Sequence, residues 1–202
     1  MEQITDQATI YIERVDPQLE ESPLLNDGDK DFLATLTAPS RRAQWATART
    51  MLRHALGAEA ELRYASSGAL IISKPIGEVR FVSISHTTEQ VAVMLSRGRC
   101  GVDIEAVGRN FSKIASRYIT PDEREQLAEQ VGEHFEALVW SAKEALYKYG
   151  AHEGLDFLQD MIVTDIDTTS QTLTAELYGL PTPPVHYKFV GNHILCYVSS
   201  DN

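Results

Sequence analysis

Short strand-like segments of this chain come in pairs that are joined by tight turns. Residues 161–167 and 172–178 form one such pair, and residues 185–190 and 193–199 form another that is separated only by a Gly-Asn dipeptide. Strands with so short a connection run antiparallel, because parallel neighbours need a crossover of about a dozen residues or more. Hairpins are therefore expected to dominate, which predicts an α+β fold.

Helical periodicity marks two longer segments among these strands. Apolar side chains recur at helical spacing in residues 40–56, where Ser40 is expected to cap the helix and Gly57 to end it. Residues 120–123 (TPDE) combine a capping box with proline at the first helical position, which is a specific signal for a helix start. This second helix is expected to break near Gly132 and then to resume.

Two other segments are assigned from composition and spacing. Residues 16–30 are acidic and contain proline, so a loop is expected, whereas the apolar spacing in residues 110–118 predicts a helix. The order of a strand, a long helix and several strands occurs once on each side of residues 96–100. We therefore expect two similar α/β halves, each an antiparallel sheet packed by a long helix, over residues 1–97 and 98–202.

Composition limits the classes of partner. The 202 residues include 18 basic and 29 acidic side chains, a formal charge of −11, which disfavours nucleic acid or an anionic membrane as the main partner.

Cys100 and Cys196 lie far apart without CxxC or zinc spacing, as expected in a reducing compartment. The sequence shows neither a signal-peptide pattern nor an apolar run near the roughly 20 residues that span a membrane. A cytoplasmic protein is the expectation.

A pair of carboxylates forms the first candidate site. Asp103 and Glu105 are two residues apart on a predicted strand over residues 100–105, so both side chains emerge on the same face. Carboxylates at this spacing can ligate one Mg²⁺, which prefers oxygen ligands. Taken alone, the pair is more simply explained as a solvated strand face.

A helical segment and a strand end supply further candidates. In residues 140–148 (WSAKEALYK), Glu144 and Lys148 share a helix face, as in many surface salt bridges. Ser85 and His86 follow a predicted strand, where histidine suits phosphate binding or acid–base chemistry but also occurs as an ordinary loop residue. Several other residues suit anionic groups or plain solvation, namely Arg41, Arg42, Arg49, Lys74 and Pro75. A Cys100 nucleophile with His86 as base is disfavoured, because Cys100 heads a strand that is expected to be buried.

In order along the chain, these fragments resemble one protein family. SISH at 83–86, GVDIE at 101–105 and WSAKEALYK at 140–148 resemble the motifs of the 4′-phosphopantetheinyl transferase superfamily, with 41 residues from Asp103 to Glu144. Length and the SxSH motif look like the surfactin-synthetase-type branch, whose single chains have two similar halves. Such enzymes move phosphopantetheine from coenzyme A to a serine hydroxyl of a carrier protein and release adenosine 3′,5′-bisphosphate.

The resemblance implies a role for each motif residue. The Mg²⁺ ligands, with Mn²⁺ as an alternative metal, would be Asp103, Glu105 and Glu144. Glu144 would act as the catalytic base. Lys148 would contact the pyrophosphate of coenzyme A, and His86 would contact a phosphate of coenzyme A. Coenzyme A would be bound by Arg41, Arg42, Arg49, Lys74, Pro75, Ser85, His86, Asp103, Lys143 and Lys148. Residues 1–97 would bind the nucleotide part of coenzyme A. Residues 98–202 would contain the metal ligands and the helix with the WSAKEALYK motif.

The expected partner is an acyl or peptidyl carrier protein, and a monomer is the expected state. Arg109, Lys113 and Arg117 recur every four residues and form a basic stripe, either a dock for the acidic carrier or a solvated face. Two other functions stay open at this stage. One is a Mg²⁺-dependent pyrophosphate hydrolase with water as acceptor, and the other is a carrier-binding module without catalysis.

Overall fold

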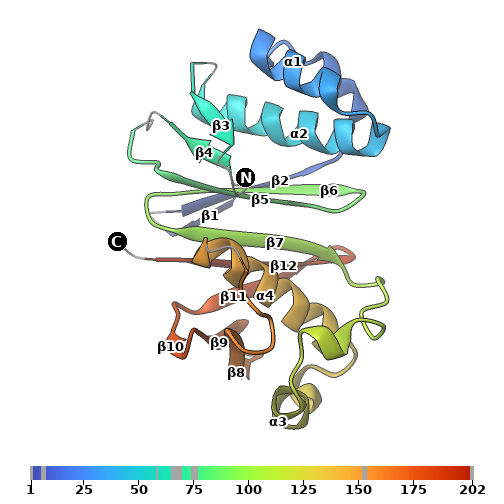
Figure 1. The fold of residues 1–202 in the computed structure, drawn as a ribbon, viewed down its shortest axis with the longest axis vertical. Coiled ribbons are helices and arrows are strands. Elements are labelled where there is room, and N and C mark those ends of the chain that lie inside the picture. Colours follow the sequence, from blue (N-terminus) through green and yellow to red (C-terminus); the bar gives the residue numbers. More distant parts are fainter. Residues whose placement is uncertain are drawn as a thin grey trace. The chain divides into compact units, whose positions relative to one another are not determined.

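The computed structural model describes residues 2–5, 8–57, 59–64, 70–73, 77–151 and 154–200. It divides into two compact units, Met1–Gly98 and Arg99–Asp201. Each unit combines helices with an antiparallel sheet, which confirms the α+β prediction (Figure 1). In the described residues, no helix is both long and apolar enough to cross a membrane.

The first unit is a four-stranded sheet covered by a long helix. Its strands lie in the order β1-β2-β6-β5, and a separate hairpin joins β3 to β4. Helix α2 packs on β2 and β6, and Leu52, Val91 and Val93 lie in the core beneath it (Figure 1). In chain order the elements are β1 (Glu2–Thr5), β2 (Ala8–Arg14), η1 (Pro17–Glu21), α1 (Asp27–Thr35), α2 (Pro39–Leu56), β3 (Leu62–Tyr64), β4 (Leu70–Ile72), β5 (Phe81–His86) and β6 (Gln90–Ser96).

Helix α1 begins inside residues 16–30, where the sequence predicted a loop, and the short 3₁₀ helix η1 lies wholly within that range. Asn26 accepts a hydrogen bond from the Asp29 backbone, the Asp29 side chain accepts one from Asn26, and Asp27 adds a second acid in the first turn. This capping box and the favourable helix dipole stabilise a helix that has few apolar residues. The predicted cap of α2 is also wrong by two residues, since α2 begins at Pro39 with Ala38 at its N-cap. Its end at Gly57 is confirmed.

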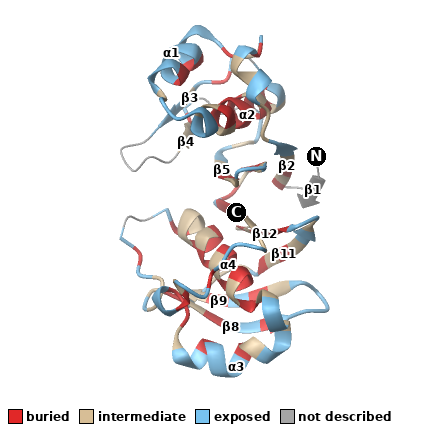
Figure 2. Cartoon of the chain, turned by 90° about the vertical axis from the view of Figure 1, so that its right-hand side faces the viewer, coloured by how far each residue is buried: buried red, intermediate tan, exposed pale blue. Residues whose placement is uncertain are grey.

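The second unit is a larger antiparallel sheet packed by α4. The strand order is β10-β9-β11-β12-β7, with β8 paired to β9, so both predicted hairpins are confirmed. Helix α4 packs on β7 and β12 with its buried side toward the sheet (Figure 2). In chain order the elements are β7 (Cys100–Ala106), η2 (Ala115–Arg117), α3 (Pro121–Val131), η3 (Gly132–His134), α4 (Phe135–Gly150), β8 (Met161–Asp167), β9 (Thr172–Leu177), β10 (Leu180–Pro181), β11 (Val185–Val190) and β12 (His193–Ser199).

The helix break at Gly132 is confirmed, but the helix predicted over residues 110–118 is wrong. Gly132 ends α3 with a φ of 65°, a conformation that favours glycine. Residues 110–118 form turns and the short 3₁₀ helix η2. Phe111, Ala115 and Tyr118 are nevertheless buried. The apolar residues recur at helical spacing because successive turns bury them, although no α-helix forms there.

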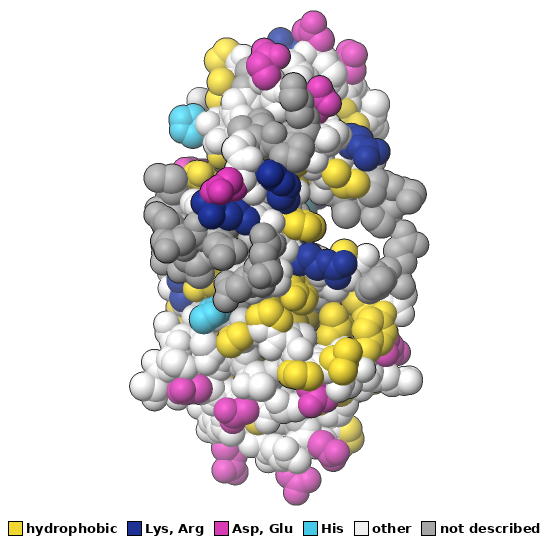
Figure 3. All heavy atoms as spheres, turned by 90° about the vertical axis from the view of Figure 1, so that its left-hand side faces the viewer, with side chains coloured by type: hydrophobic (Ala, Val, Ile, Leu, Met, Phe, Trp, Pro, Cys, Tyr) yellow, Lys and Arg dark blue, Asp and Glu magenta, His cyan; other side chains and the backbone are white. Residues whose placement is uncertain are grey.

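The acidic side chains do not gather in one place on the face of the molecule that Figure 3 draws. On the face drawn in Figure 3, Asp and Glu side chains lie scattered, mostly as single residues. The formal charge of −11 is thus not concentrated in one acidic patch on this face.

Candidate functional site

Strand β7 and helix α4 bring the GVDIE and WSAKEALYK motifs together in the second unit. A Cβ atom built on Gly101 would lie 1.9 Å from the Ala145 carbonyl oxygen and 2.8 Å from the Tyr149 backbone nitrogen. Only glycine allows the helix to approach the strand this closely. The close contact places Asp103 of β7 beside the last two turns of α4.

Asp103 and Lys148 form a largely buried ion pair. The Lys148 Nζ donates to Asp103 Oδ1 at 2.9 Å and to the Val102 carbonyl oxygen at 2.8 Å. The exposed fraction is 5% for the Asp103 side chain and 25% for that of Lys148. The ammonium group is therefore fixed at the carboxylate, with part of its surface still open to solvent.

Glu105 is held by two donors on one oxygen. Its Oε1 accepts from Trp140 Nε1 at 2.9 Å and from Arg109 Nη1 at 2.6 Å. The Arg109 guanidinium also lies over the rings of Phe111 and Trp140, at 5.0 and 5.4 Å from their centroids. These cation–π contacts add to the ion pair and fix Arg109 against the Glu105 carboxylate.

Glu144, the third carboxylate, shares the electrostatic environment of the other two. Burial raises the pKa of Glu144, the negative charge of Asp103 raises it further, and Lys148 opposes this shift. Burial likewise raises the pKa of Glu105, again with a contribution from Asp103. The three carboxylates therefore repel one another, and a nearby cation would relieve that repulsion.

The donor types fit a hard divalent cation. Carboxylate oxygens are the ligands that Mg²⁺ prefers, and three of them here influence one another electrostatically. Two of the three now pair with Lys148 and Arg109. Within the described ranges, no three His, Cys, Asp or Glu side chains are arranged to hold a metal ion. Mg²⁺ binding by Asp103, Glu105 and Glu144 stays a prediction.

Lys143 is placed inside the second unit and not at its surface. Its side chain is fully buried, and Nζ lies 2.7 Å from Glu123 Oε1 and donates to the Phe157 carbonyl oxygen at 2.9 Å. Glu123 also accepts from the backbone of Thr120 at 2.8 Å and of Val163 at 2.9 Å. This placement supports an anchoring role between α3 and α4, and the predicted contact of Lys143 with coenzyme A is untested.

In the first unit, the structure brings Arg41 and His86 together. Arg41 Nη1 donates to His86 Nε2, so in this pairing the neutral imidazole carries its proton on Nδ1. His86 ends β5, and Ser85 before it is buried in the same strand. Lys74 and Pro75, also predicted to bind coenzyme A, lie outside the described residues.

Arg42 and Arg49 form ion pairs with acidic side chains of the first unit. Arg42 pairs with Glu20 at 2.7 Å and donates to the Leu33 carbonyl oxygen at 2.8 Å. Arg49 is buried and lies 3.3 Å from the Asp29 carboxylate. Arg41 and Arg49 are eight residues apart on α2, which corresponds to roughly 12 Å along the helix axis. Their predicted contacts with coenzyme A stay predictions.

Sequence reasoning missed three partners at these sites. The hydrogen bond of Trp140 to Glu105 links residues 35 positions apart, and no local pattern signals it. Glu123 was visible as the residue at position N3 of a capping box, but its buried bond to Lys143 was not. The pairing of Arg109 with Glu105 did have a signal, namely their spacing of four residues.

Comparison with known families agrees with this arrangement of motifs. Residues 99–198 match the profile of the 4′-phosphopantetheinyl transferase superfamily, and the second unit is therefore a domain of that superfamily. No curated protein sequence matches the chain. Membership of the surfactin-synthetase-type branch stays a prediction.

Proposed function

We propose that the protein transfers 4′-phosphopantetheine from coenzyme A to a serine hydroxyl of an acyl or peptidyl carrier protein. The observation that carries the proposal is the meeting of the family's two acidic motifs on β7 and α4, with Lys148 bonded to Asp103. Superfamily membership supports phosphopantetheinyl transfer in general. The coenzyme A substrate, the metal and the carrier acceptor are parts of the proposal.

The reaction is a displacement at phosphorus. The serine oxygen forms a bond to the β-phosphorus of coenzyme A, the bond from that phosphorus to the bridging oxygen breaks, and adenosine 3′,5′-bisphosphate leaves. Negative charge on the pyrophosphate must be offset as the bond breaks. The partly exposed Lys148 ammonium, fixed by Asp103 and Val102, is suited to that task. In the first unit, Arg41 and His86 are proposed to hold phosphate oxygens of coenzyme A.

Asp103, Glu105 and Glu144 would hold Mg²⁺, with Mn²⁺ as an alternative. When bound, the metal would supply Lewis-acid polarisation and charge neutralisation at the pyrophosphate. Trp140 and Arg109 keep Glu105 Oε1 in one position before any metal arrives. Among the described residues, the hydrogen bonds of Glu105 all use Oε1, so Oε2 would be open to a ligand.

Glu144 is the proposed base for the serine hydroxyl. A serine alkoxide is too basic to form freely at neutral pH, so the hydroxyl proton must pass to a base as the new bond forms. The Glu144 carboxylate is within electrostatic range of the other two acidic groups and would take up this proton. Glu144→Gln removes the base but keeps the size of the side chain.

Docking of the carrier is proposed at Lys113 and Arg117, which are exposed near η2. Arg109 belonged to the predicted stripe, but it pairs with Glu105 and stacks on two rings. Its guanidinium is thus partly committed to the site. The proposed docking surface therefore rests on Lys113 and Arg117.

The test is the intact mass of a purified apo carrier protein after incubation with this protein, coenzyme A and Mg²⁺. We expect a gain of one phosphopantetheine group that disappears with a chelator. Release of adenosine 3′,5′-bisphosphate without carrier would favour the pyrophosphate hydrolase. Coenzyme A binding without either product, across several carriers, would favour a non-catalytic module.

Matched variants separate the roles of the carboxylates. Asp103→Asn should abolish the mass gain, whereas Asp165→Asn, the same change at an exposed position of β8, should not. Glu144→Gln should lower turnover by at least about a hundredfold with little change in coenzyme A affinity, because it removes proton transfer. Glu129→Gln on exposed α3 is its control. Equal losses of turnover and affinity in Glu144→Gln would remove the base role.

A further inference from the structure

The two hydrogen bonds of the Glu105 carboxylate to described residues both end on one oxygen. Trp140 Nε1 donates to Oε1 at 2.9 Å, and Arg109 Nη1 donates to the same oxygen at 2.6 Å. A carboxylate oxygen offers about two lone-pair sites to donors, so these two donors fill Oε1. A metal ion that meets Glu105 in this arrangement is left with Oε2.

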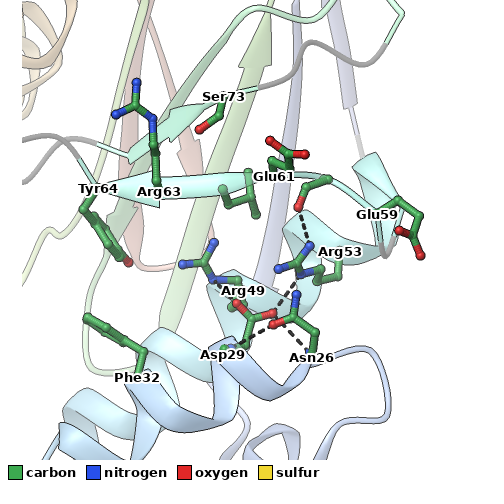
Figure 4. A pocket seen from close by; sticks show the side chains of 13 residues that line it. Asn26, Asp29, Phe32, Arg49, Arg53, Glu59, Glu61, Arg63, Tyr64 and Ser73 are labelled. Atoms are coloured by element: carbon green, nitrogen blue, oxygen red, sulfur yellow. Dashed lines mark hydrogen bonds and ion pairs between the residues drawn. The ribbon is translucent and has the colours of Figure 1, made fainter.

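The buried Asp29 carboxylate of the first unit shows the other arrangement, in which donors reach both oxygens. Arg49 Nε lies 3.3 Å from Oδ1, and Arg53 Nε donates to Oδ2 at 2.8 Å (Figure 4). The Asn26 backbone N–H also donates to Oδ2, at 3.3 Å. The one-sided bonding of Glu105 is thus a property of its own surroundings and not of every buried carboxylate in this chain.

Three aromatic neighbours hold the Trp140 ring in place. Phe157 stacks on it, with ring centroids 5.6 Å apart and an interplanar angle of 18°. Tyr118 meets it edge-on at 5.0 Å, and Phe111 lies 6.4 Å away. Tyr118 and Phe111 are themselves buried. Packing therefore fixes the direction of the Trp140 N–H toward Glu105.

Arg109 reaches Glu105 from a turn at the end of β7. Its backbone N–H donates to the Ala106 carbonyl oxygen at 3.1 Å, so the chain folds back toward the strand. The guanidinium makes cation–π contacts with Phe111 and Trp140, which hold it over the carboxylate. The two donors thus approach Oε1 from separate elements, one from this turn and the other from α4.

The number of oxygens that a carboxylate offers bears on the choice of metal. Ca²⁺ takes about six to eight oxygen ligands and accepts both oxygens of one carboxylate, whereas the smaller Mg²⁺ demands near-ideal octahedral geometry. A glutamate that offers one oxygen suits Mg²⁺ and denies Ca²⁺ a bidentate ligand. Groups that hydrogen-bond to a metal ligand also orient it, and loss of one such group costs about 10–100-fold in metal affinity.

We propose that Arg109 and Trp140 are positioning residues that restrict Glu105 to one oxygen and thereby favour Mg²⁺ over Ca²⁺ at the proposed metal site. The inference rests on the proposed function, because that function assigns Glu105 to the metal. It adds a source of metal selectivity that three carboxylates alone do not provide. Both residues would act through Glu105 and not by contact with the metal.

Competition against Mn²⁺ tests this selectivity. The full-length protein is titrated with Mn²⁺, with and without coenzyme A, and free Mn²⁺ is measured by electron paramagnetic resonance. Displacement by Mg²⁺ and by Ca²⁺ gives the ratio of their affinities. Arg109→Gln and Trp140→Phe should each shift this ratio toward Ca²⁺ by about tenfold. The charge lost in Arg109→Gln cancels in the ratio, because both competitors carry the same charge.

Two matched variants are the controls. Arg124 bonds to Glu136 at 3.0 Å and lies 6.0 Å from the centroid of the Phe135 ring, so Arg124→Gln breaks the same kind of contact elsewhere in the second unit. Trp45→Phe removes an indole N–H that donates to the Tyr64 hydroxyl in the first unit. Both controls should keep the wild-type ratio.

A wild-type ratio in both Arg109→Gln and Trp140→Phe would overturn the proposal, and so would equal affinity of the wild type for Mg²⁺ and Ca²⁺. Arg109 is 45% exposed, so Arg109→Gln keeps the test valid if Trp140→Phe fails to fold. The mass gain of the carrier is measured with the same preparations. A shifted ratio without any mass gain would support the positioning role and count against phosphopantetheinyl transfer. An unchanged ratio with a normal mass gain would count against the positioning role alone.

Discussion

At the scale of single residues, burial decides which reactive side chains are available. Cys100 and Cys196 are both unpaired and buried, and burial raises the pKa of the Cys100 thiol to about 12. Burial raises the pKa of Cys196 as well. A thiol reacts as its thiolate, so burial leaves very little of the reactive form of either group at neutral pH.

We therefore expect both cysteines to resist iodoacetamide at pH 8 in the folded protein. A shift from the ordinary 9.0 to about 12 leaves about a thousandfold less thiolate at Cys100. Two alkylations should appear in the intact mass only after unfolding in guanidinium chloride. Rapid modification of native Cys100 would show that the top of β7 opens to solvent.

At the scale of elements, the contact between β7 and α4 depends on one glycine. Gly101→Ala would place a Cβ within 1.9 Å of the Ala145 backbone, which cannot move without shifting the helix. We expect a loss of about 3 kcal/mol or more in the free energy of unfolding, measured by urea denaturation. Gly108→Ala is the matched control, because a Cβ there meets nothing within 4 Å. Equal stability of the two variants would refute the close packing.

The Glu123–Lys143 pair is a second connection between elements. Lys143→Met should cost about 3–5 kcal/mol, because it leaves a buried carboxylate without its cation. Replacing Glu123 by Gln in the same protein should recover much of that loss, since Gln keeps acceptor capacity for Thr120 and Val163. Glu136→Gln, which breaks the exposed pair with Arg124, should cost less than about 1 kcal/mol. A small effect of Lys143→Met would instead favour a role in ligand binding.

Elements with strong local signals were predictable from the sequence. The capping box at Thr120, the break at Gly132 and the two hairpins depend on neighbouring residues, and all are observed. Helix α1 was missed because capping and charge, not apolar spacing, define it. The helix over residues 110–118 was wrongly predicted because turns can bury residues at helical spacing.

At the scale of the whole molecule, the meeting of the two acidic motifs was easier to predict than the contacts around them. Motif order indicated Asp103 and Lys148, and the structure joins them by a hydrogen bond. Contacts between residues distant in sequence were not predictable, as with Trp140 on Glu105 or Arg49 on Asp29. Such contacts depend on the packing of whole elements, which one sequence does not encode in any local pattern.

Net charge and local charge make opposite predictions for carrier binding. With a formal charge of −11, the chain as a whole would repel an acidic carrier, whereas Lys113 and Arg117 at the proposed dock would attract it locally. If these two residues form the proposed dock, the KM for the carrier should rise as salt increases from 0.1 to 1 M, because the screening length falls from about 10 to about 3 Å. Substitution of Lys113 and Arg117 should leave the KM for coenzyme A unchanged.

The decisive comparison is between two double variants of equal charge. Lys113→Glu with Arg117→Glu should raise the carrier KM severalfold and abolish its rise with salt, since attraction becomes repulsion that salt screens. Arg14→Glu with Lys30→Glu makes the same change in net charge at exposed positions of the first unit. If both double variants raise the carrier KM equally, net charge governs docking and the proposed surface is wrong. A rise confined to the Lys113 and Arg117 variant means that local attraction outweighs the overall charge of the chain.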